Sequence, residues 1–444
     1  MHDFFEHVED DHACLFESGG NGRYSYIAYD PFLLVWSQKG VVQISEIKDF
    51  FNFKKTSAGG IMDVRANKAL REIFEEFRFK GDAPVPFSGG AAGFIGYDYG
   101  CGFNGVEQQV YDDLGVSDFR FNFYDKVIAF DHQENVYYFI AHAETDIGAK
   151  RKIEEIKTDL KKPLRLRRAG RFGEVKSNVS EADYIQKVNQ IKELLKKGES
   201  YQVNYSQRFR ADCTVDGWTV YKKLAGVNPS PFSCYLKYPD YSIVSASPEL
   251  LLRKRGTVLE TWPIKGTVRR GKNKYEDLKL AEELLKSKKD DAELSMIVDL
   301  ERNDLGRVCE MGSVKVDSHR EIQNLSHVIH TFSRVSGVLD KKKNIFDALE
   351  AVFPSGSITG CPKKRTMEII DKFEDFKRGI YTGSAGFIGF NGESDFNILI
   401  RSLLLKDGEA YFHAGGGIVM DSDAKKEYDE SLMKARAITE TLKN

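Results

Sequence analysis

The sequence predicts an α+β fold in which antiparallel sheets are backed by helices. Up to about residue 145, short alternating or aromatic runs broken by Gly, Asp and Asn are typical of strands. After residue 180, strand-like and helical segments alternate irregularly, without the regular strand–helix repeat of a parallel sheet. With 444 residues, 41% of them hydrophobic, the chain can bury a large core or two or three core-forming units.

In the first part of the chain, five runs predict strands: RYSYIAYD, LLVWSQ, VVQIS, KVIAFD and NVYYFIA. One helix is expected at 66–79, because apolar side chains recur there at helical spacing. The charged stretch 150–178, with one Pro and a late Gly, favours a solvated helix that runs into an exposed connection. We therefore divide the chain into residues 1–150, a connecting segment 151–179 and residues 180–444.

Three patterns define the expected elements of the second part. A helix should begin after Ser180, a good N-cap residue followed by acidic residues, and end at Gly198. Residues 232–266 are typical of two or three consecutive strands, and 396–418 contains another strand pattern. GGAAGFIGYDYG and GSAGFIGFNG echo each other, and their glycines favour close approach between backbones.

Composition narrows the class of protein. The formal charge of -2, from 65 basic and 67 acidic residues, argues against an electrostatic footprint for nucleic acid or a membrane surface. No apolar run approaches the ~20 residues of a membrane span, and the acidic start differs from a signal peptide, so we expect a cytoplasmic protein. Six cysteines without a C-x-x-C pair should be reduced and mostly buried. Cys361 is expected to pack rather than to act as a nucleophile.

One lysine stands between a β-branched residue and a glycine in the stretch PIKGT. Lys265 follows the strand-like run VLETW and is expected in a turn, from which its side chain points off a sheet edge. Burial would lower its pKa and free the amine as a nucleophile. Two consecutive antiparallel strands would bring Glu249 close to it, and a carboxylic acid beside an amine is an acid–nucleophile pair.

Two helical patterns place carboxylates near the Gly-rich strand end HAGGGI. In DDAELSMIVDLERNDLGR the apolar residues face a core and leave Glu293 on a neighbouring face. In AKKEYDESLMKARAI, Glu427 and Glu430 lie three residues apart, with Lys434 four further on. Solvated helices with a Glu–Lys pair are one interpretation. The other is Mg²⁺, which accepts carboxylates from two helices and completes its octahedron with substrate oxygens and waters.

Nine longer motifs follow residue 180: GESYQVNYSQR, SASPELLLR, PIKGT, MIVDLERNDLGRV, SHVIHTFS, FPSGSITGCPKKRTMEII, GIYTGSAGFIG, ILIRSLLL and AGGGIVMDSDAKKEYDESLMKA. Together with looser matches at CLFESG, RYSYIAYDP and PFSGGAAGFIGYDYG, they make the sequence resemble the chorismate-utilising enzymes, anthranilate synthase component I and its relatives. The resemblance implies two packed antiparallel β-sheets with surrounding helices and an active site between them. It makes residues 180–444 a chorismate-binding catalytic region.

Within that family, one position separates two reactions. Anthranilate synthases resemble PIAGT at 263–267, whereas aminodeoxychorismate synthases carry PIKGT, as here, although they usually continue with Arg-Pro-Arg instead of Val268-Arg269-Arg270. Isochorismate and salicylate synthases carry a water-activating lysine at the position of Gln202, so ammonia is the expected nucleophile. The resemblance implies that Lys265 attacks C2 of chorismate while Glu249 protonates the leaving C4 hydroxyl. Ammonia would then enter at C4 and expel the lysine.

The resemblance also implies roles for other residues. Tyr381 and Arg401 would hold the enolpyruvyl carboxylate, and further pocket positions would be Gly415, Gly416, Gly417, Thr267, Ser357, His330, Lys434 and Gln202. For His330 a satisfied core histidine is the alternative. Mg²⁺ would be held by Glu293 and Glu430, with Glu427 through water. Leu15, Glu17 and Ser18 resemble an element that lines a tryptophan pocket in relatives, and here we favour a structural role or filling by core side chains.

We therefore expect component I of an aminodeoxychorismate synthase, a transferase that makes 4-amino-4-deoxychorismate from chorismate and ammonia for p-aminobenzoate and folate synthesis. Because no glutaminase portion is recognisable, a separate glutamine amidotransferase is the expected source of ammonia. Anthranilate synthase component I is the first alternative, against which Lys265 argues. The second is an inactive homologue that binds chorismate or tryptophan for regulation, against which the intact acidic and lysine residues argue.

Overall fold

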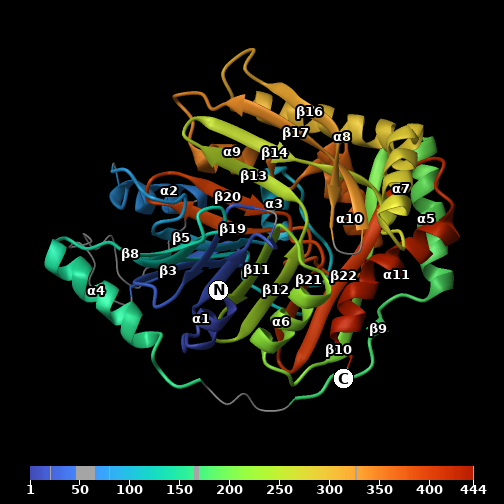
Figure 1. The fold of residues 1–444 in the computed structure, drawn as a ribbon. Helices are drawn as coiled ribbons and strands as arrows, with labels where there is room; N and C mark the ends of the chain where they lie inside the picture. Colours follow the sequence, from blue (N-terminus) through green and yellow to red (C-terminus); the bar gives the residue numbers. More distant parts are fainter. Residues whose placement is uncertain (21, 47–65, 80, 165–169, 326–327, 444) are drawn as a thin grey trace.

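The computed structural model describes residues 1–20, 22–46, 66–79, 81–164, 170–325 and 328–443. Within these ranges the chain forms two antiparallel sheets of eleven strands each, with helices packed around them (Figure 1). The α+β class and the two-sheet architecture are confirmed. None of the described helices is long and apolar enough to cross a membrane.

The first sheet contains, in spatial order, β18 (Gly360–Cys361), β10 (Gln202–Asp212), β22 (Glu409–Ile418), β21 (Ser402–Lys406), β12 (Tyr241–Ser247), β11 (Phe232–Lys237), β1 (Cys14–Glu17), β2 (Tyr24–Ala28), β7 (Lys126–Asp131) and β8 (Val136–Ala141), with β9 (Lys176–Ser177) added to β10. The second contains β15 (Ile264–Arg269), β17 (Val328–Val338), β14 (Val258–Trp262), β13 (Leu250–Arg255), β20 (Ser394–Asn397), β19 (Ser384–Gly389), β5 (Gly90–Ile95), β6 (Phe119–Tyr124), β3 (Leu33–Gln38) and β4 (Val41–Glu46), with β16 (Lys315–Asn324) added to β17.

The helices are α1 (His2–Glu6), α2 (Ala66–Glu76), α3 (Tyr97–Phe103), α4 (Asp146–Asp159), α5 (Glu181–Lys196), α6 (Gly217–Val227), α7 (Lys274–Lys286), α8 (Lys288–Gly306), α9 (Ile345–Val352), α10 (Lys363–Phe373) and α11 (Ala424–Thr441), with a 3₁₀ turn η1 (Gly356–Ile358). The predicted cap of α5 is present, because the Ser180 side chain accepts a hydrogen bond from the Asp183 amide at 3.2 Å. The predicted solvated helix is α4, whereas residues 165–169 of the expected connection lie outside the described residues.

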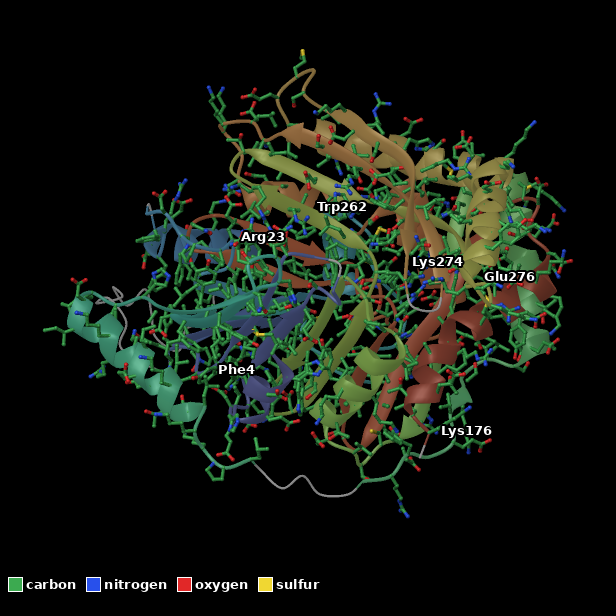
Figure 2. All side chains as sticks on the ribbon, viewed as in Figure 1. Phe4, Arg23, Lys176, Trp262, Lys274 and Glu276 are labelled. Carbon is green, nitrogen blue, oxygen red and sulfur yellow. The ribbon has the colours of Figure 1, made fainter. Side chains whose placement is uncertain are left out.

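One large apolar cluster lies between the two sheets, where side chains of both pack against each other. Two others lie between a sheet and the helices that cover it, and side chains fill the space around the ribbon (Figure 2). The Tyr26 ring of β2 meets the Phe387 ring of β19 edge-on, with centroids 5.3 Å apart. Each sheet mixes strands from before residue 150 with strands from after residue 180, so both parts of the chain build one core. The six cysteines are free, and five are fully buried, as expected. Burial also raises the pKa of Cys361, which opposes thiolate chemistry.

The two similar glycine-rich segments, GGAAGFIGYDYG and GSAGFIGFNG, lie side by side. β5 and β19 pair antiparallel along their length, with Gly93 opposite Gly386. A Cβ on Gly93 would lie 1.8 Å from the Arg120 carbonyl oxygen, and one on Gly386 would lie 2.0 Å from the Asp395 carbonyl oxygen. The glycines therefore permit the close backbone approach that the sequence predicted.

The Gly93→Ala substitution should lower stability by about 1–3 kcal/mol or more, because the new methyl group overlaps a carbonyl oxygen of β6. Gly226→Ala is the matched control: its Cβ meets nothing within 4 Å, and alanine in α6 should add about 1 kcal/mol. Thermal unfolding followed by circular dichroism measures both. Equal melting temperatures for the two variants would contradict the close approach.

Candidate functional site

The strands β13, β14 and β15 bring Glu249 and Lys265 together. Glu249 immediately precedes β13, whose Leu250 pairs with Trp262 at the end of β14. The chain then continues into β15, and the Ile264 amide donates to Oε1 of Glu249 at 3.4 Å. The predicted proximity is therefore confirmed. The predicted turn at Lys265 is wrong: the residue lies within β15, where Gly266, at a φ of 76°, forms a bulge opposite β17 that keeps the strand paired.

Lys265 is partly buried, and its Nζ donates to the Ser357 carbonyl oxygen of η1 at 3.4 Å. Burial lowers its pKa, and the charge of Lys434 acts in the same direction. Glu293, Glu249 and Glu430 oppose this shift without cancelling it. A larger fraction of the amine is therefore unprotonated and nucleophilic at neutral pH than in an exposed lysine.

The Glu249 side chain has the opposite tendency. It is 4% exposed, and burial raises its pKa, although the Ser357 hydroxyl, Lys265 and Arg401 favour the ionised form. The site thus tends toward a neutral acid beside a neutral amine. That combination can protonate a leaving group and attack carbon in one step.

Arg401, His330 and Thr267 form a connected group beside Glu249. The Arg401 guanidinium donates to Nε2 of His330 at 3.2 Å, so His330 is the tautomer whose Nδ1 hydrogen faces the Thr267 hydroxyl, 2.6 Å away. Burial and Arg401 keep the pKa of His330 well below its ordinary value. Burial also lowers the pKa of Arg401 to about 10, and no carboxylate of the described residues forms an ion pair with it. Such a cation suits a carboxylate ligand.

Tyr381 is held between two elements of the first sheet. Its ring stacks on His413 of β22, with centroids 4.9 Å apart and planes 15° apart. The side chains of Asn204 and Ser206 on β10 lie near its hydroxyl. The ring is therefore fixed in one orientation, as a ligand contact requires.

The ion pair between Glu374 and Arg378 anchors the residues around Tyr381. Both side chains are buried, and the guanidinium lies 2.7–2.8 Å from both carboxylate oxygens. Arg378 also donates to the carbonyl oxygens of Ile358 at 3.1 Å and Asn204 at 2.7 Å, and so joins η1 to β10. This pair was not predicted, although its i, i+4 spacing is visible in the sequence.

The glycine-rich end of β22 lies against β10 and under α11. A Cβ on Gly416 would lie 3.1 Å from Oε2 of Glu427, 3.6 Å from Nζ of Lys434 and 3.7 Å from Oε1 of Glu430. Gly415 accepts a hydrogen bond from Nζ of Lys434 at 3.1 Å. A Cβ on Gly417 would be 2.9 Å from Cδ of Gln202, whose two amide atoms are buried without a hydrogen-bond partner. Gly415 and Gly416 therefore lie beside Lys434 and the predicted carboxylates, whereas Gly417 lies beside Gln202.

Three carboxylates from α8 and α11 face this strand end and Lys265. Glu427 accepts from Ser422 at 2.7 Å, and burial raises its pKa. Burial pushes the pKa of Glu430 upward, but Lys434, 2.7 Å away, outweighs it and leaves the pKa lowered. The charge of Glu293 also acts on Lys265 and opposes the lowering of the lysine pKa. No three acidic, histidine or cysteine side chains of the described residues form a preformed metal cage. The carboxylate oxygens nevertheless fit a hard cation that takes its other ligands from substrate and water.

The residues considered for a tryptophan pocket lie in and after β1. Leu15 is fully buried in the apolar cluster that contains Trp218. Glu17 accepts hydrogen bonds from His2 at 2.9 Å and from Tyr221 at 2.6 Å. Ser18 is buried, and its amide donates to the Ser25 hydroxyl at 3.4 Å. Side chains of this chain occupy the surroundings of Leu15 and Glu17.

Two further polar residues behind Glu249 were not predicted. Glu301 of α8 is fully buried, and Ser355 lies 2.7 Å from its Oε1. Burial raises the pKa of Glu301 to about 7, and the neighbouring Asp304 adds to the shift. A signal was present in the sequence, because Glu301 continues the apolar stripe of Leu294 and Ile297 at helical spacing. A carboxylate at a core position is a feature that needs an explanation.

Comparisons with known proteins agree with this architecture. The family model described as chorismate binding enzyme matches residues 12–440. The chain is 38% identical to aminodeoxychorismate synthase component 1 of Bacillus subtilis, over 97% of this chain and 92% of that protein. It is 36% identical to anthranilate synthase component 1 of Acetivibrio thermocellus, over 99% and 92%.

A solved structure is similar over almost the whole chain. The crystal structure of anthranilate synthase component I from Streptococcus pneumoniae superposes with a TM-score of 0.84 at 31% sequence identity, covering 94% of this chain and 92% of the other. The sequence match, the shared two-sheet architecture and the described site lead to one conclusion: the chain belongs to the family of chorismate-binding enzymes.

Proposed function

We propose that this chain is component I of an aminodeoxychorismate synthase, which converts chorismate and ammonia into 4-amino-4-deoxychorismate. Overall identity does not discriminate, because relatives of both synthase types lie at 36–38%. The observation that carries the proposal is the position of Lys265. Its amine lies beside the buried acid Glu249 and has a lowered pKa.

The residues support a two-stage substitution. In the first stage Nζ of Lys265 forms a bond to C2 of chorismate, the two conjugated double bonds shift, and the C4–oxygen bond breaks. Glu249 supplies the proton with which the C4 hydroxyl leaves as water. In the second stage ammonia bonds to C4, the double bonds shift back and the lysine leaves C2. The lysine blocks C2 and thereby directs nitrogen to the para position.

The group around Arg401 would orient the substrate. Its guanidinium, free of a carboxylate among the described residues, would pair with a substrate carboxylate, and Tyr381 would donate its hydroxyl hydrogen. His330 would hold the guanidinium and Thr267 in place without itself bearing charge, because its pKa is lowered. We therefore assign His330 a positioning role.

Mg²⁺ would be held by Glu293 and Glu430, with Glu427 acting through water. When bound, the ion would neutralise a substrate carboxylate and polarise the leaving group. It would also compensate the three carboxylates that otherwise favour protonation of Lys265, because a nearby cation disfavours an ammonium. Lys434 would complete the charge balance through its ion pair with Glu430.

Ammonia would come from a separate amidotransferase subunit. The relatives in the comparison are named as component 1, which implies a second component. The test is whether glutamine supports turnover only when a candidate amidotransferase is added, whereas ammonium salts support it without one. Turnover with glutamine by the chain alone would contradict this part of the proposal.

The product is the first prediction of the proposal. Incubation with chorismate, Mg²⁺ and excess ammonium, followed by an aminodeoxychorismate lyase, should give p-aminobenzoate on chromatography. Lys265→Ala should lose at least about a hundredfold in this activity, because the nucleophile is absent, and some anthranilate should appear. Lys272→Ala, at an exposed position, is the control. Anthranilate as the main product of the unmodified protein, formed without lyase, would identify an anthranilate synthase instead.

The metal assignment gives the second prediction. Dialysis against EDTA should abolish chorismate consumption, and added Mg²⁺ should restore it. Glu430→Gln should raise the Mg²⁺ concentration for half-maximal activity by about tenfold or more, a loss of about 1.4 kcal/mol. Glu440→Gln on the same helix, whose partner Arg436 is exposed, should leave it unchanged. Activity that survives chelation would contradict the assignment of Mg²⁺ to these carboxylates.

A further inference from the structure

Glu301 is a fully buried carboxyl without a cation of its own. It lies on the inner face of α8, and no ion pair to it occurs within the described residues. The nearby cation Lys363 is engaged elsewhere, since its Nζ is 2.7 Å from Oδ2 of Asp304. Asp304 is also 2.9 Å from Arg307. A structural carboxylate would be expected to have such a partner, so the burial of Glu301 calls for another explanation.

A chain of two hydroxyl groups connects Glu301 to Glu249. Oε1 of Glu301 lies 2.7 Å from Oγ of Ser355, and Oγ of Ser355 lies 3.0 Å from Oγ of Ser357. The Ser357 hydroxyl in turn lies close enough to the Glu249 carboxyl to favour its ionised form. Ser355 and Ser357 are 3% and 5% exposed, which leaves little access for competing water. The chain therefore joins the acid of the site to a second carboxyl behind it.

The hydrogen count of this chain fits a single mobile proton. If Glu301 holds the proton, it donates to Ser355, Ser355 donates to Ser357, and Ser357 donates to an ionised Glu249. If Glu249 holds the proton, the direction of all three hydrogen bonds is reversed. In both arrangements every link has one hydrogen, and the pair carries one negative charge instead of two while it shares one proton. Burial raises the pKa of both carboxyls, which favours retention of that proton at neutral pH.

We propose that Glu301 is a proton-relay residue that supplies Glu249, through Ser355 and Ser357, with the proton that Glu249 gives to the leaving C4 hydroxyl of chorismate. The Ser357 hydroxyl hydrogen passes to Glu249, that of Ser355 to Ser357, and that of Glu301 to Ser355. The O–H bond of Glu249 then breaks as water leaves C4. When ammonia has bonded to C4, one of its protons returns along the same path to Glu301, so that ammonia enters, water leaves and the protons balance.

This relay rests on the proposed function only in one respect, the departure of the C4 hydroxyl. The same departure is needed whether nitrogen enters at C4 or at C2. Glu301 acts through Glu249 and does not touch substrate. The charged and titratable groups around it are Asp304 on its own helix, Lys363 of α10 and Glu249 before β13. Thr261 of β14 adds a hydroxyl 3.3 Å from its other oxygen.

The pH dependence of chorismate consumption tests the relay. Glu249 must be protonated to act, so activity falls as pH rises through the pKa of the carboxyl pair. Glu301→Gln keeps the shape and a hydrogen bond to Ser355 but removes the second carboxyl, whose negative charge supports protonation of Glu249. In the pH profile of kcat/KM, the fall in activity on the alkaline side should therefore move to lower pH by about one unit, which is about a tenfold loss at pH values well above the original midpoint. Thr261→Val, which removes a hydrogen bond to Glu301 outside the path, should leave the pH dependence of kcat/KM unchanged.

A second readout does not depend on activity. Infrared spectra of the unmodified protein, titrated between pH 5 and pH 9, should contain the band of a protonated buried carboxyl at neutral pH, and Glu301→Gln should lose it. An unchanged alkaline limb in a folded Glu301→Gln variant, or a uniform loss at every pH, would overturn the relay and leave a structural role. If the unmodified protein did not consume chorismate at all, the proposed function would fail, whereas the infrared titration would still test the shared proton.

Discussion

Burial of an acid beside an amine is the constraint on which the rest of the site depends. Glu249 and Lys265 lie next to each other because β13, β14 and β15 follow one another without a long connection. Burial moves their pKa values in opposite directions, up for the carboxyl and down for the amine. In water such a pair would exist as two ions, whereas here burial shifts both groups toward the neutral forms that the chemistry needs.

The scaffold keeps this arrangement by tying separate elements to it. The turn η1 contributes Ser357, whose carbonyl oxygen and hydroxyl contact the amine and the acid respectively. Arg378 binds η1 to β10 from behind, through carbonyl oxygens on both. Arg401 has a φ of 52°, a conformation that costs a non-glycine residue of the order of 1 kcal/mol. Such strain persists where the position of a side chain matters more than backbone stability.

Several features could be predicted from the sequence because they are local. Periodicity and capping residues located α5, and the order of strands after residue 232 placed Glu249 beside Lys265. The turn expected at Lys265 was wrong, because glycine signals a bulge as readily as a turn and only the pairing with β17 distinguishes them. For the same reason, local sequence patterns do not predict the other contacts between segments that are distant in the sequence.

Glu301 illustrates what periodicity alone leaves out. Its position in the apolar stripe of α8 was visible, but its partner Ser355 is fifty-four residues away and reaches it only through the packing of η1 on the helix. Likewise, the stacking of Tyr381 on His413 joins the loop before β19 to the strand β22. Side chains that meet through tertiary packing leave no spacing signal in the sequence.

The most direct test of the central claim is the mass of the intact protein after rapid mixing with chorismate and Mg²⁺ in the absence of ammonia, followed by acid quenching. If Lys265 is the nucleophile, the protein should gain the mass of chorismate less one water, and proteolysis should locate the addition on the peptide that contains Lys265. Lys265→Ala should show no addition. An unmodified mass in a preparation that turns over rapidly once ammonia is added would contradict covalent attack by the lysine.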